Sequence, residues 1–221
     1  MRARAGYRRS MTDPGFDAAL PRCWWSSAGG DRPDPAMVRY HDEEWGRPCH
    51  DDTELFERLT LEAFQAGLSW STILHKRDAF RIAFRGFDPT VVAAFGDADR
   101  ERLMADAGIV RNRAKIDASI RNAAAWLATA GEFGSVDAYF ATMMPGPPAG
   151  LAVDVQSGEI PARTDVSDAL SADLRRRGFR FVGSTIVYAL MQSIGLVDDH
   201  LPGCFRYITP EERAVRAVVT R

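Results

Sequence analysis

The feature that most constrains this chain is the position of its best candidate metal ligands, which lie near its two ends. Cys23 and His41 stand near the start, whereas His200 and Cys204 stand near the finish with a Leu-Pro-Gly turn between them. Two thiolates and two imidazoles make a complete tetrahedral set for structural zinc. A metal held by all four would require the two ends of the chain to meet.

The cysteine and histidine content leaves alternatives open. Cys49 and His50 are a rival ligand pair, although adjacent residues rarely converge on one ion, and unrelated free thiols and scattered histidines fit the spacing as well. Three cysteines are too few, and odd in number, for a disulfide framework. This count favours a reducing compartment in which thiols stay free. We therefore expect a cytoplasmic protein.

Composition limits the size and class of the fold. With 221 residues and 46% hydrophobic content, the chain can bury a substantial core as one domain or two small lobes. Residues 1–20 contain arginines but no following apolar run, so we expect a flexible leader and not a secretory signal. The most apolar run, 181–197, is too short and too polar to span a membrane and indicates a buried helix. No coiled-coil pattern is present, so we expect a monomer without a protein partner.

Helix start and stop signals predict an all-α chain. Asp51 or Asp52 is expected to cap a helix that runs to about Ala66. Asp88 precedes a proline that can open the next helix, and Asp97 can cap a third that ends before the glycine at 108. No strand-rich region and no internal repeat are present.

The same signals place the remaining elements. Ser167 is expected to cap a helix that Gly178 ends, and the Pro- and Gly-rich segment 144–163 is expected to be irregular. Further helices are predicted over about 112–129, 136–143 and 183–195. We expect a helical domain over 21–204, with one lobe at about 50–150, a second lobe from 21–49 and 151–204, and a tail over 205–221.

One acidic residue breaks the pattern of the first predicted helix. Leu55, Leu59 and Ala63 recur at helical spacing, and at 100° per residue Glu62 lies only about 20° from Leu55. A buried carboxylate is costly unless it has a partner or faces a cavity in which a ligand supplies one. The alternative is a glutamate at the edge of the stripe that reaches solvent or a nearby arginine.

Aromatic residues gather close to this glutamate in the sequence. The segment Gln-Ala-Gly-Leu-Ser-Trp over 65–70 brings an amide, the protruding Leu68 and the indole of Trp70 beside it. Tyr40 belongs to a second aromatic segment, Tyr-His-Asp-Glu-Glu-Trp-Gly. Aromatic rings around a carboxylate suit a flat, polar or cationic ligand through stacking and cation–π attraction.

Basic charge is local in this chain, whose net charge is -2. The segment 106–115 is typical of a helix-hairpin-helix, in which turn amides at Gly108 and a following helix N-terminus can hold a DNA phosphate. Arg111, Arg113 and Lys115 add positive charge there, and a second basic cluster at 175–180 can flank the backbone. Such clusters can equally be solvated helix faces.

Together these residues resemble the 3-methyladenine DNA glycosylase I family, within the helix-hairpin-helix glycosylase superfamily. The resemblance covers about Arg22 to Cys204. It is carried by Arg-Cys, Tyr-His-Asp-x-Glu-Trp-Gly, Leu-Glu-x-x-Gln-Ala-Gly-Leu-Ser-Trp, Asp-Ala-Gly-Ile, Arg-Gly-Phe-x-Phe-Val-Gly and Asp-His-x-x-Gly-Cys. It implies two helical lobes whose N- and C-terminal segments are joined by one structural zinc ion bound to Cys23, His41, His200 and Cys204. This set is thereby favoured over the Cys49-His50 pair.

The resemblance also implies a base pocket. Trp70 would stack on an extruded methylated adenine, Glu62 and Tyr40 would make polar contacts, and Trp25 would line the pocket. Departures from the family pattern occur at Trp24, Phe64 and Met37.

The implied activity is hydrolysis of the N-glycosidic bond of 3-methyladenine in alkylated double-stranded DNA. Glu62 would read the base and support the chemistry, and Leu68 would fill the gap in the duplex. No lysine stands in a motif for strand cleavage, so a monofunctional enzyme is indicated. Two alternatives remain: a metal-dependent phosphohydrolase that uses His41, Asp42, Asp199 and His200, and a non-catalytic DNA-binding module.

Overall fold

The computed structural model describes residues 20–27, 33–144, 149–150, 160–209 and 212. Nearly all of the predicted leader, much of 144–163 and most of the predicted tail lie outside these residues. The described helices are α1 Pro35–Glu43, α2 Asp52–Gln65, α3 Trp70–Ala83, α4 Pro89–Ala93, α5 Asp97–Ala105, α6 Arg113–Phe133, α7 Val136–Met143, α8 Asp165–Arg176 and α9 Ser184–Ser193. Two short 3-10 helices, η1 Trp24–Ser27 and η2 Arg85–Phe87, and one two-residue parallel pair, β1 Ala149–Gly150 with β2 Val197–Asp198, complete them.

The described chain is mostly helical, as predicted, because local capping signals act where they were expected. Asp51 caps α2 by accepting hydrogen bonds from the amides of Thr53 and Glu54. Asp88 caps α4 in the same way, with proline at its first position. Gly178 follows α8, and its amide donates to the carbonyl of Arg175.

Two predicted caps are wrong by one and three residues. Asp97 is the first residue of α5, and Gly96 is the N-cap, because the Asp99 carboxylate accepts the amide of Gly96. Thr164, not Ser167, is the N-cap of α8. The Thr164 hydroxyl accepts the Ser167 amide, and the Ser167 hydroxyl accepts the Thr164 amide in a reciprocal capping box.

Two helices, α1 and α3, were not predicted from the sequence. Asp34 caps α1 through a 3.0 Å hydrogen bond from the Ala36 amide, with proline at the first helical position. Ser69 caps α3 by accepting the Thr72 amide. Both capping signals are present in the sequence, within two segments that the aromatic residues alone mark as part of a binding surface.

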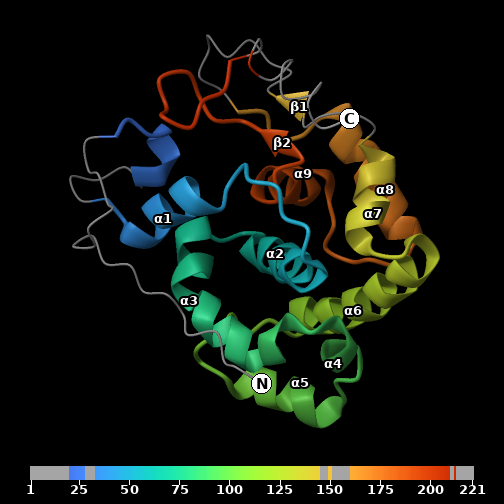
Figure 1. Cartoon of the computed structure of the whole chain (residues 1–221). Helices are drawn as coiled ribbons and strands as arrows, with labels where there is room; N and C mark the ends of the chain where they lie inside the picture. The colour runs from blue at the N-terminus through green and yellow to red at the C-terminus, as the bar shows by residue number, and fades with distance from the viewer. Residues whose placement is uncertain (1–19, 28–32, 145–148, 151–159, 210–211, 213–221) are drawn as a thin grey trace.

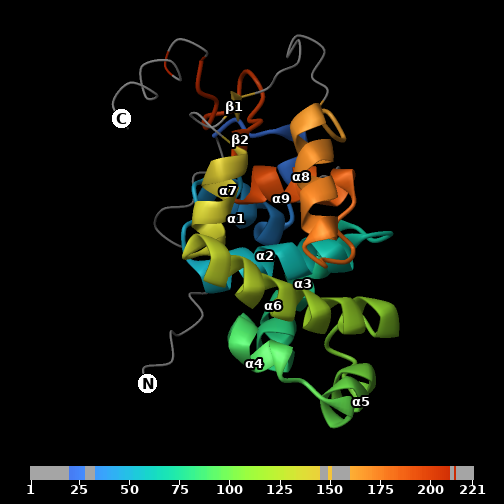
Figure 2. The same ribbon diagram turned by 90° about the vertical axis from the view of Figure 1, so that its right-hand side faces the viewer.

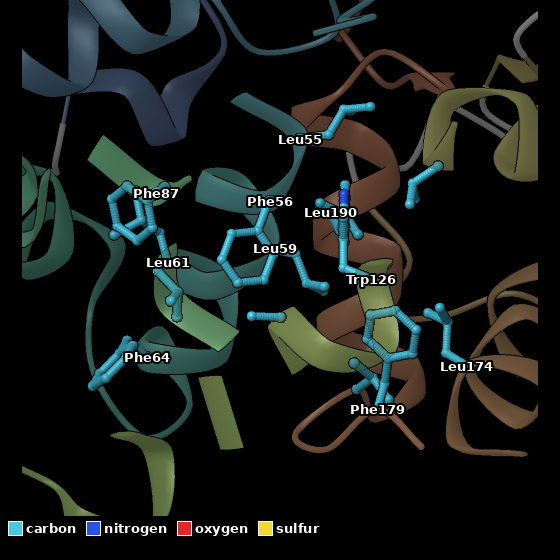
Figure 3. Close-up of a cluster of buried hydrophobic side chains, with 14 of the residues drawn as sticks. Leu55, Phe56, Leu59, Leu61, Phe64, Phe87, Trp126, Leu174, Phe179 and Leu190 are labelled. Carbon is cyan, nitrogen blue, oxygen red and sulfur yellow. The ribbon is translucent and has the colours of Figure 1, made fainter. Parts of the chain in front are cut away.

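Helix α2 is the centre of the molecule. Every residue from Leu55 to Phe64 is buried, and α3, α6, α7 and α9 all pack against it. Figure 1 shows α2 in the middle of the ring of helices, and Figure 3 shows Phe56 and Leu59 between Trp126 on one side and Phe87 on the other. The predicted one-sided stripe therefore underestimates the burial of α2, which lies inside the core on all its faces.

The two ends of the described chain meet beside α1. The amide of Phe205 donates to the carbonyl of Pro21, and the amide of Leu201 donates to the sulfur of Cys23. In Figure 1 the last described segment runs back over the same side of the molecule as α1. One large core joins α2 through α9, and the division into two lobes stays a prediction. None of the described helices is both long and apolar enough to cross a membrane.

Candidate functional site

A pocket of about 560 Å³ opens beside the C-terminal half of α2. The four residues predicted to bind a base all line it, although they come from four different elements. Glu62 comes from α2, Tyr40 from α1, Trp70 from the first position of α3, and Trp25 from η1. The complete lining is Trp24, Trp25, Met37, Tyr40, Trp45, Glu62, Gln65, Trp70, Ile160, Ala189 and Gln192.

The walls of the pocket are aromatic. The rings of Tyr40 and Trp70 lie 5.1 Å apart with a tilt of 53°, and Trp25 packs edge-to-face on Trp45 at 4.8 Å. The indole N–H of Trp70 is buried and has no hydrogen-bond partner among the described residues. Such walls present flat apolar faces and an unpaired donor, which suits a planar heterocycle with acceptor atoms.

Glu62 is the acidic group of the pocket, and its side chain is 3% exposed. Burial raises the pKa of Glu62 from its ordinary value of 4.5 to about 8, and the positive charge of Arg58 opposes part of that rise. The Arg58 guanidinium itself donates to Glu54 and to the carbonyl of Ser193. Burial and the charge of Glu62 also raise the pKa of Tyr40. The pocket thus holds a carboxyl group that a cation would ionise.

Gln192 is a polar pocket residue that the sequence analysis missed. Its amide Nε2 donates to Asp199 Oδ2 at 2.7 Å, and the Tyr188 hydroxyl donates to the same oxygen at 2.6 Å. Because an ionised carboxylate only accepts hydrogen bonds, Asp199 fixes the orientation of the Gln192 amide and leaves its carbonyl oxygen as the acceptor toward a ligand. No local pattern marks Gln192, since its position depends on the packing of α9 against α2.

The three departures from the family pattern have different environments. Trp24 lines the mouth of the pocket with 68% of its surface exposed, and Met37 lines the wall. Phe64 is fully buried against Phe80, with ring centroids 4.8 Å apart, and belongs to the core. Only Trp24 and Met37 can therefore alter the shape of the pocket directly.

The segment predicted to be a hairpin connects α5 to α6. Gly108 lies at its turn, where an added Cβ would stand 2.9 Å from Asp106 Oδ1 and 3.0 Å from the Cβ of Ala79, so a larger residue does not fit. Arg111 is exposed. Arg113 is exposed too and pairs with Glu101 at 2.6 Å.

Lys115 does not face the solvent as predicted. It is 6% exposed, and its ammonium donates to the carbonyls of Phe64 at 2.8 Å and Ala66 at 2.6 Å, at the C-terminus of α2. A cation there stabilises the helix end by satisfying carbonyls that have no partner within α2. Lys115 therefore joins α6 to α2, and its side chain is not available to a phosphate. Leu68, in contrast, protrudes from the α2–α3 turn with 42% of its surface exposed.

Three of the four predicted metal ligands, Cys23, His41 and Cys204, gather where the two ends of the chain meet, and His200 lies beside this group without belonging to it. One ligand atom from each of Cys23, His41 and Cys204 lies within 4.8 Å of the others, and the Cys204 sulfur is 3.3 Å from His41 Nε2. The rings of His41 and His200 lie 5.0 Å apart, and the buried Nε2 of His200 has no hydrogen-bond partner among the described residues. A Cβ on Gly46 would stand 2.8 Å from the His200 ring.

Carboxylates orient both imidazoles from outside the cluster. Asp42 accepts from His41 Nδ1 at 2.8 Å and is itself held by Arg22. Asp198 accepts from His200 Nδ1 at 2.6 Å. The Nδ1 atom of each ring is thereby occupied, which leaves Nε2 as the nitrogen that can bind a metal.

The alternative metal sites lack this arrangement. Asp42 is held by Arg22, and Asp199 accepts from Tyr188 and Gln192, so neither carboxylate is free for a phosphohydrolase metal. Cys49 packs in the main core, whereas His50 lies at the surface and pairs with Asp137. The geometry thus favours the cluster at the chain ends over the Cys49-His50 pair.

Comparisons with known proteins identify the family to which the chain belongs. A family model for methyladenine glycosylase matches residues 30–207. DNA-3-methyladenine glycosylase 1 of Escherichia coli is 47% identical over 190 residues, which is 85% of this chain and 97% of that protein. DNA-3-methyladenine glycosylase of Haemophilus influenzae is 46% identical over 76% of this chain and 90% of its own length.

Solved structures give the same result. The crystal structure of a 3-methyladenine DNA glycosylase I superposes with a TM-score of 0.77 at 46% identity, covering 85% of this chain and all of that one. The Staphylococcus aureus enzyme, studied for its recognition of 3-methyladenine, superposes with a TM-score of 0.76 at 35% identity, over 83% of this chain and 96% of that one. Because the family model covers most of the chain and these relatives agree with it in sequence and fold, the chain belongs to the methyladenine glycosylase family.

Proposed function

We propose that this protein is a monofunctional DNA glycosylase that hydrolyses the N-glycosidic bond of 3-methyladenine in alkylated double-stranded DNA. The observation that carries the proposal is the buried carboxyl of Glu62 inside an aromatic pocket. The relatives that share this family are named for the same activity. A repair function is consistent with the cytoplasmic location expected from the cysteine content.

The substrate chemistry suits these groups. A nucleotide methylated at N3 of adenine carries a positive charge, so breaking the bond from C1′ to N9 releases a neutral base without protonation of the leaving group. The bonding electrons pass to the base, water adds to C1′, and the water loses a proton. Glu62 in its ionised form would stabilise the cationic base and the positive charge that develops on the sugar. Trp70 would hold the ring by stacking, and Tyr40 would make a polar contact with it.

Extrusion of the damaged nucleotide costs a few kcal/mol, and less for a damaged pair. Leu68, on the exposed α2–α3 turn, is proposed to fill the gap left in the duplex. The turn at Gly108 and the exposed side chains of Arg111 and Arg113 are proposed to bind backbone phosphates. Lys115 is omitted from this contact because its ammonium is held by α2.

The cluster at the chain ends fits a structural zinc ion. Cys23, His41, His200 and Cys204 would provide a complete tetrahedral set, and the buried, unpartnered Nε2 of His200 supports that assignment. Four protein ligands leave no position for a reacting water, so the ion would stabilise the junction of the ends and take no part in hydrolysis.

The activity is tested by incubating the protein with duplex DNA that carries labelled N3-methyladenine, in the presence of a chelator. We expect release of free 3-methyladenine and an intact strand with an abasic site. Chelation should not abolish the reaction if the tightly bound metal is structural. Binding to the abasic product without any base release would instead identify a non-catalytic DNA-binding module, and activity only with added divalent cation would identify a metal-dependent hydrolase.

The zinc proposal is tested by elemental analysis of protein purified without a metal-binding tag. We expect one zinc ion per chain. Cys204→Ser should lose both zinc and thermal stability, because removal of a ligand opens the tetrahedral set. Cys49→Ser is the matched control, since Cys49 is a buried free cysteine that lies in the main core. Equal zinc content in wild type and Cys204→Ser would contradict the assignment.

A further inference from the structure

The loop between α8 and α9 holds an aromatic residue in an unfavourable backbone conformation. Phe181 has φ +52°, in the left-handed region, and its side chain is 38% exposed. Its neighbours Phe179 and Val182 are almost completely buried. A bulky residue rarely adopts this conformation, and here more than a third of the residue's surface stays exposed. Backbone strain at an exposed aromatic residue motivates the hypothesis of a binding role.

Phe181 borders a hollow of about 450 Å³ that shares no residue with the base pocket. Arg121 from α6 and Arg180 from the loop are its basic lining residues. The acidic residue of the hollow is Asp117. Its carboxylate pairs at 2.9 Å with Arg100, which does not line the hollow, so the negative charge of Asp117 is compensated. Arg180 Nη1 donates to the carbonyls of Gly178 at 3.3 Å and Phe179 at 3.0 Å, which leaves its Nε and Nη2 groups for a ligand. Arg121 and Phe181 are exposed at the same hollow.

Hydrogen bonds attach the α8–α9 loop to α6, the helix into which the predicted hairpin leads. The Asn122 side chain donates to the carbonyl of Arg180 at 3.0 Å and accepts its amide at 2.7 Å. One stripe of α6 thereby fixes the Phe181 loop through Asn122 and the Leu68 turn through Lys115. Figure 2 shows the α2–α3 turn, the α8–α9 loop and the beginning of α6 on one side of the molecule.

We propose that the hollow bounded by Arg121, Arg180 and Phe181 is a second nucleotide subsite, which binds a nucleotide of the duplex other than the one extruded into the base pocket. The Phe181 ring stacks on a base, and the two guanidinium groups bind the adjoining phosphates. This inference rests on the proposed function, because the ligand is the DNA substrate itself. The subsite accounts for both the exposed ring and the strained backbone of Phe181.

The main test is Phe181→Gly, measured by binding to a duplex oligonucleotide with a tetrahydrofuran abasic site, where no reaction occurs. We expect the dissociation constant to rise by about 5- to 150-fold, the range for loss of one base–aromatic stack. Since glycine adopts positive φ without strain, the melting temperature should stay the same or rise. Binding of free 3-methyladenine should be unchanged, and Phe181→Tyr should retain wild-type duplex affinity.

Val166→Ala is the matched control, because Val166 is exposed to a similar degree, 42%, at the other end of α8. Wild-type duplex affinity in Phe181→Gly, or an equal loss in Val166→Ala, would overturn the subsite. Arg121→Ala should reduce the slope of log affinity against log salt by about one, whereas Arg176→Ala should not, because Arg176 pairs with Asp173. If wild type released no 3-methyladenine while Phe181→Gly still lost duplex affinity, the subsite would stand and the proposed function would fail.

Discussion

Two buried glutamates on α2 have opposite environments. Glu57, 7% exposed, accepts hydrogen bonds from Arg77 at 2.5 Å and Arg81 at 2.9 Å, and Arg77 also pairs with Glu44. Glu62, 3% exposed, faces an open pocket, with Arg58 as its nearby positive charge. A buried acid with fixed cations is a structural element. A buried acid beside a cavity can instead bind a cationic ligand that enters the cavity.

Among the substitutions that test this contrast, Glu57→Gln is expected to have the largest effect on stability. The change would leave the buried guanidinium of Arg77 with Glu44 as its remaining carboxylate, and breaking a buried ion pair costs roughly 3–5 kcal/mol. We expect the free energy of unfolding in urea to fall by an amount near the lower end of this range. Binding of 3-methyladenine by the folded variant should persist. A variant with wild-type stability would show that the charged cluster around Glu57 does not hold α2 and α3 together.

The matched change on the other side of α2 is Glu62→Gln. It preserves shape but removes the charge that a cationic base requires, so single-turnover excision of 3-methyladenine should fall roughly 100-fold or more, as it does when a charge-stabilising group is lost from an active site. The fold should survive, as judged by circular dichroism. Excision at the wild-type rate in this variant would show that Glu62 takes no part in the reaction and has only a structural role, like Glu57.

The contrast also separates what the sequence could and could not predict. Helical periodicity placed Glu62 inside the molecule because that argument is local to one helix. The same argument failed for Lys115, since the ammonium finds its acceptors 51 and 49 residues away at Phe64 and Ala66. Gln192 was missed for the same reason: its orientation depends on Asp199 and on the meeting of α9 with α2.

Residue type and capping were more informative than pattern alone. Asp51, Asp88 and Gly178 mark helix ends through bonds that span two or three residues, so they can be predicted locally. Cys23 and Cys204 could be paired only through their family resemblance, because 181 positions of sequence separate them and spacing alone left other ligand pairs open. Long-range packing, which no local pattern encodes, decides the remaining site residues.

A smaller effect is expected in the dependence of excision on pH. The pKa of Glu62 near 8 means that the free pocket is mostly protonated at pH 6, whereas the cationic substrate selects the ionised form. The methylated nucleotide owes its charge to alkylation and not to a titrating proton. Excision at subsaturating DNA should therefore rise by up to about tenfold per pH unit below pH 8 and then level off. Glu62→Gln should remove this rise, and a flat wild-type profile from pH 6 to pH 8 would contradict it.

The smallest expected effect concerns stability, and it has the opposite sign from that of Glu57→Gln. The folded pKa of Glu62, about 8, lies above its ordinary value of 4.5, so between these values the folded state binds more protons than the unfolded state. The contribution of Glu62 to stability is therefore fully present below pH 4.5 and is lost as the pH rises through 8. The Glu62→Gln variant does not lose this stability as the pH rises, because glutamine does not titrate. Relative to wild type, its free energy of unfolding should increase by about 2 kcal/mol between pH 6 and pH 8, measured by urea denaturation at both values. A difference that stays constant with pH would mean that a fixed partner already compensates the Glu62 charge in the folded protein, and the two glutamates of α2 would then be alike.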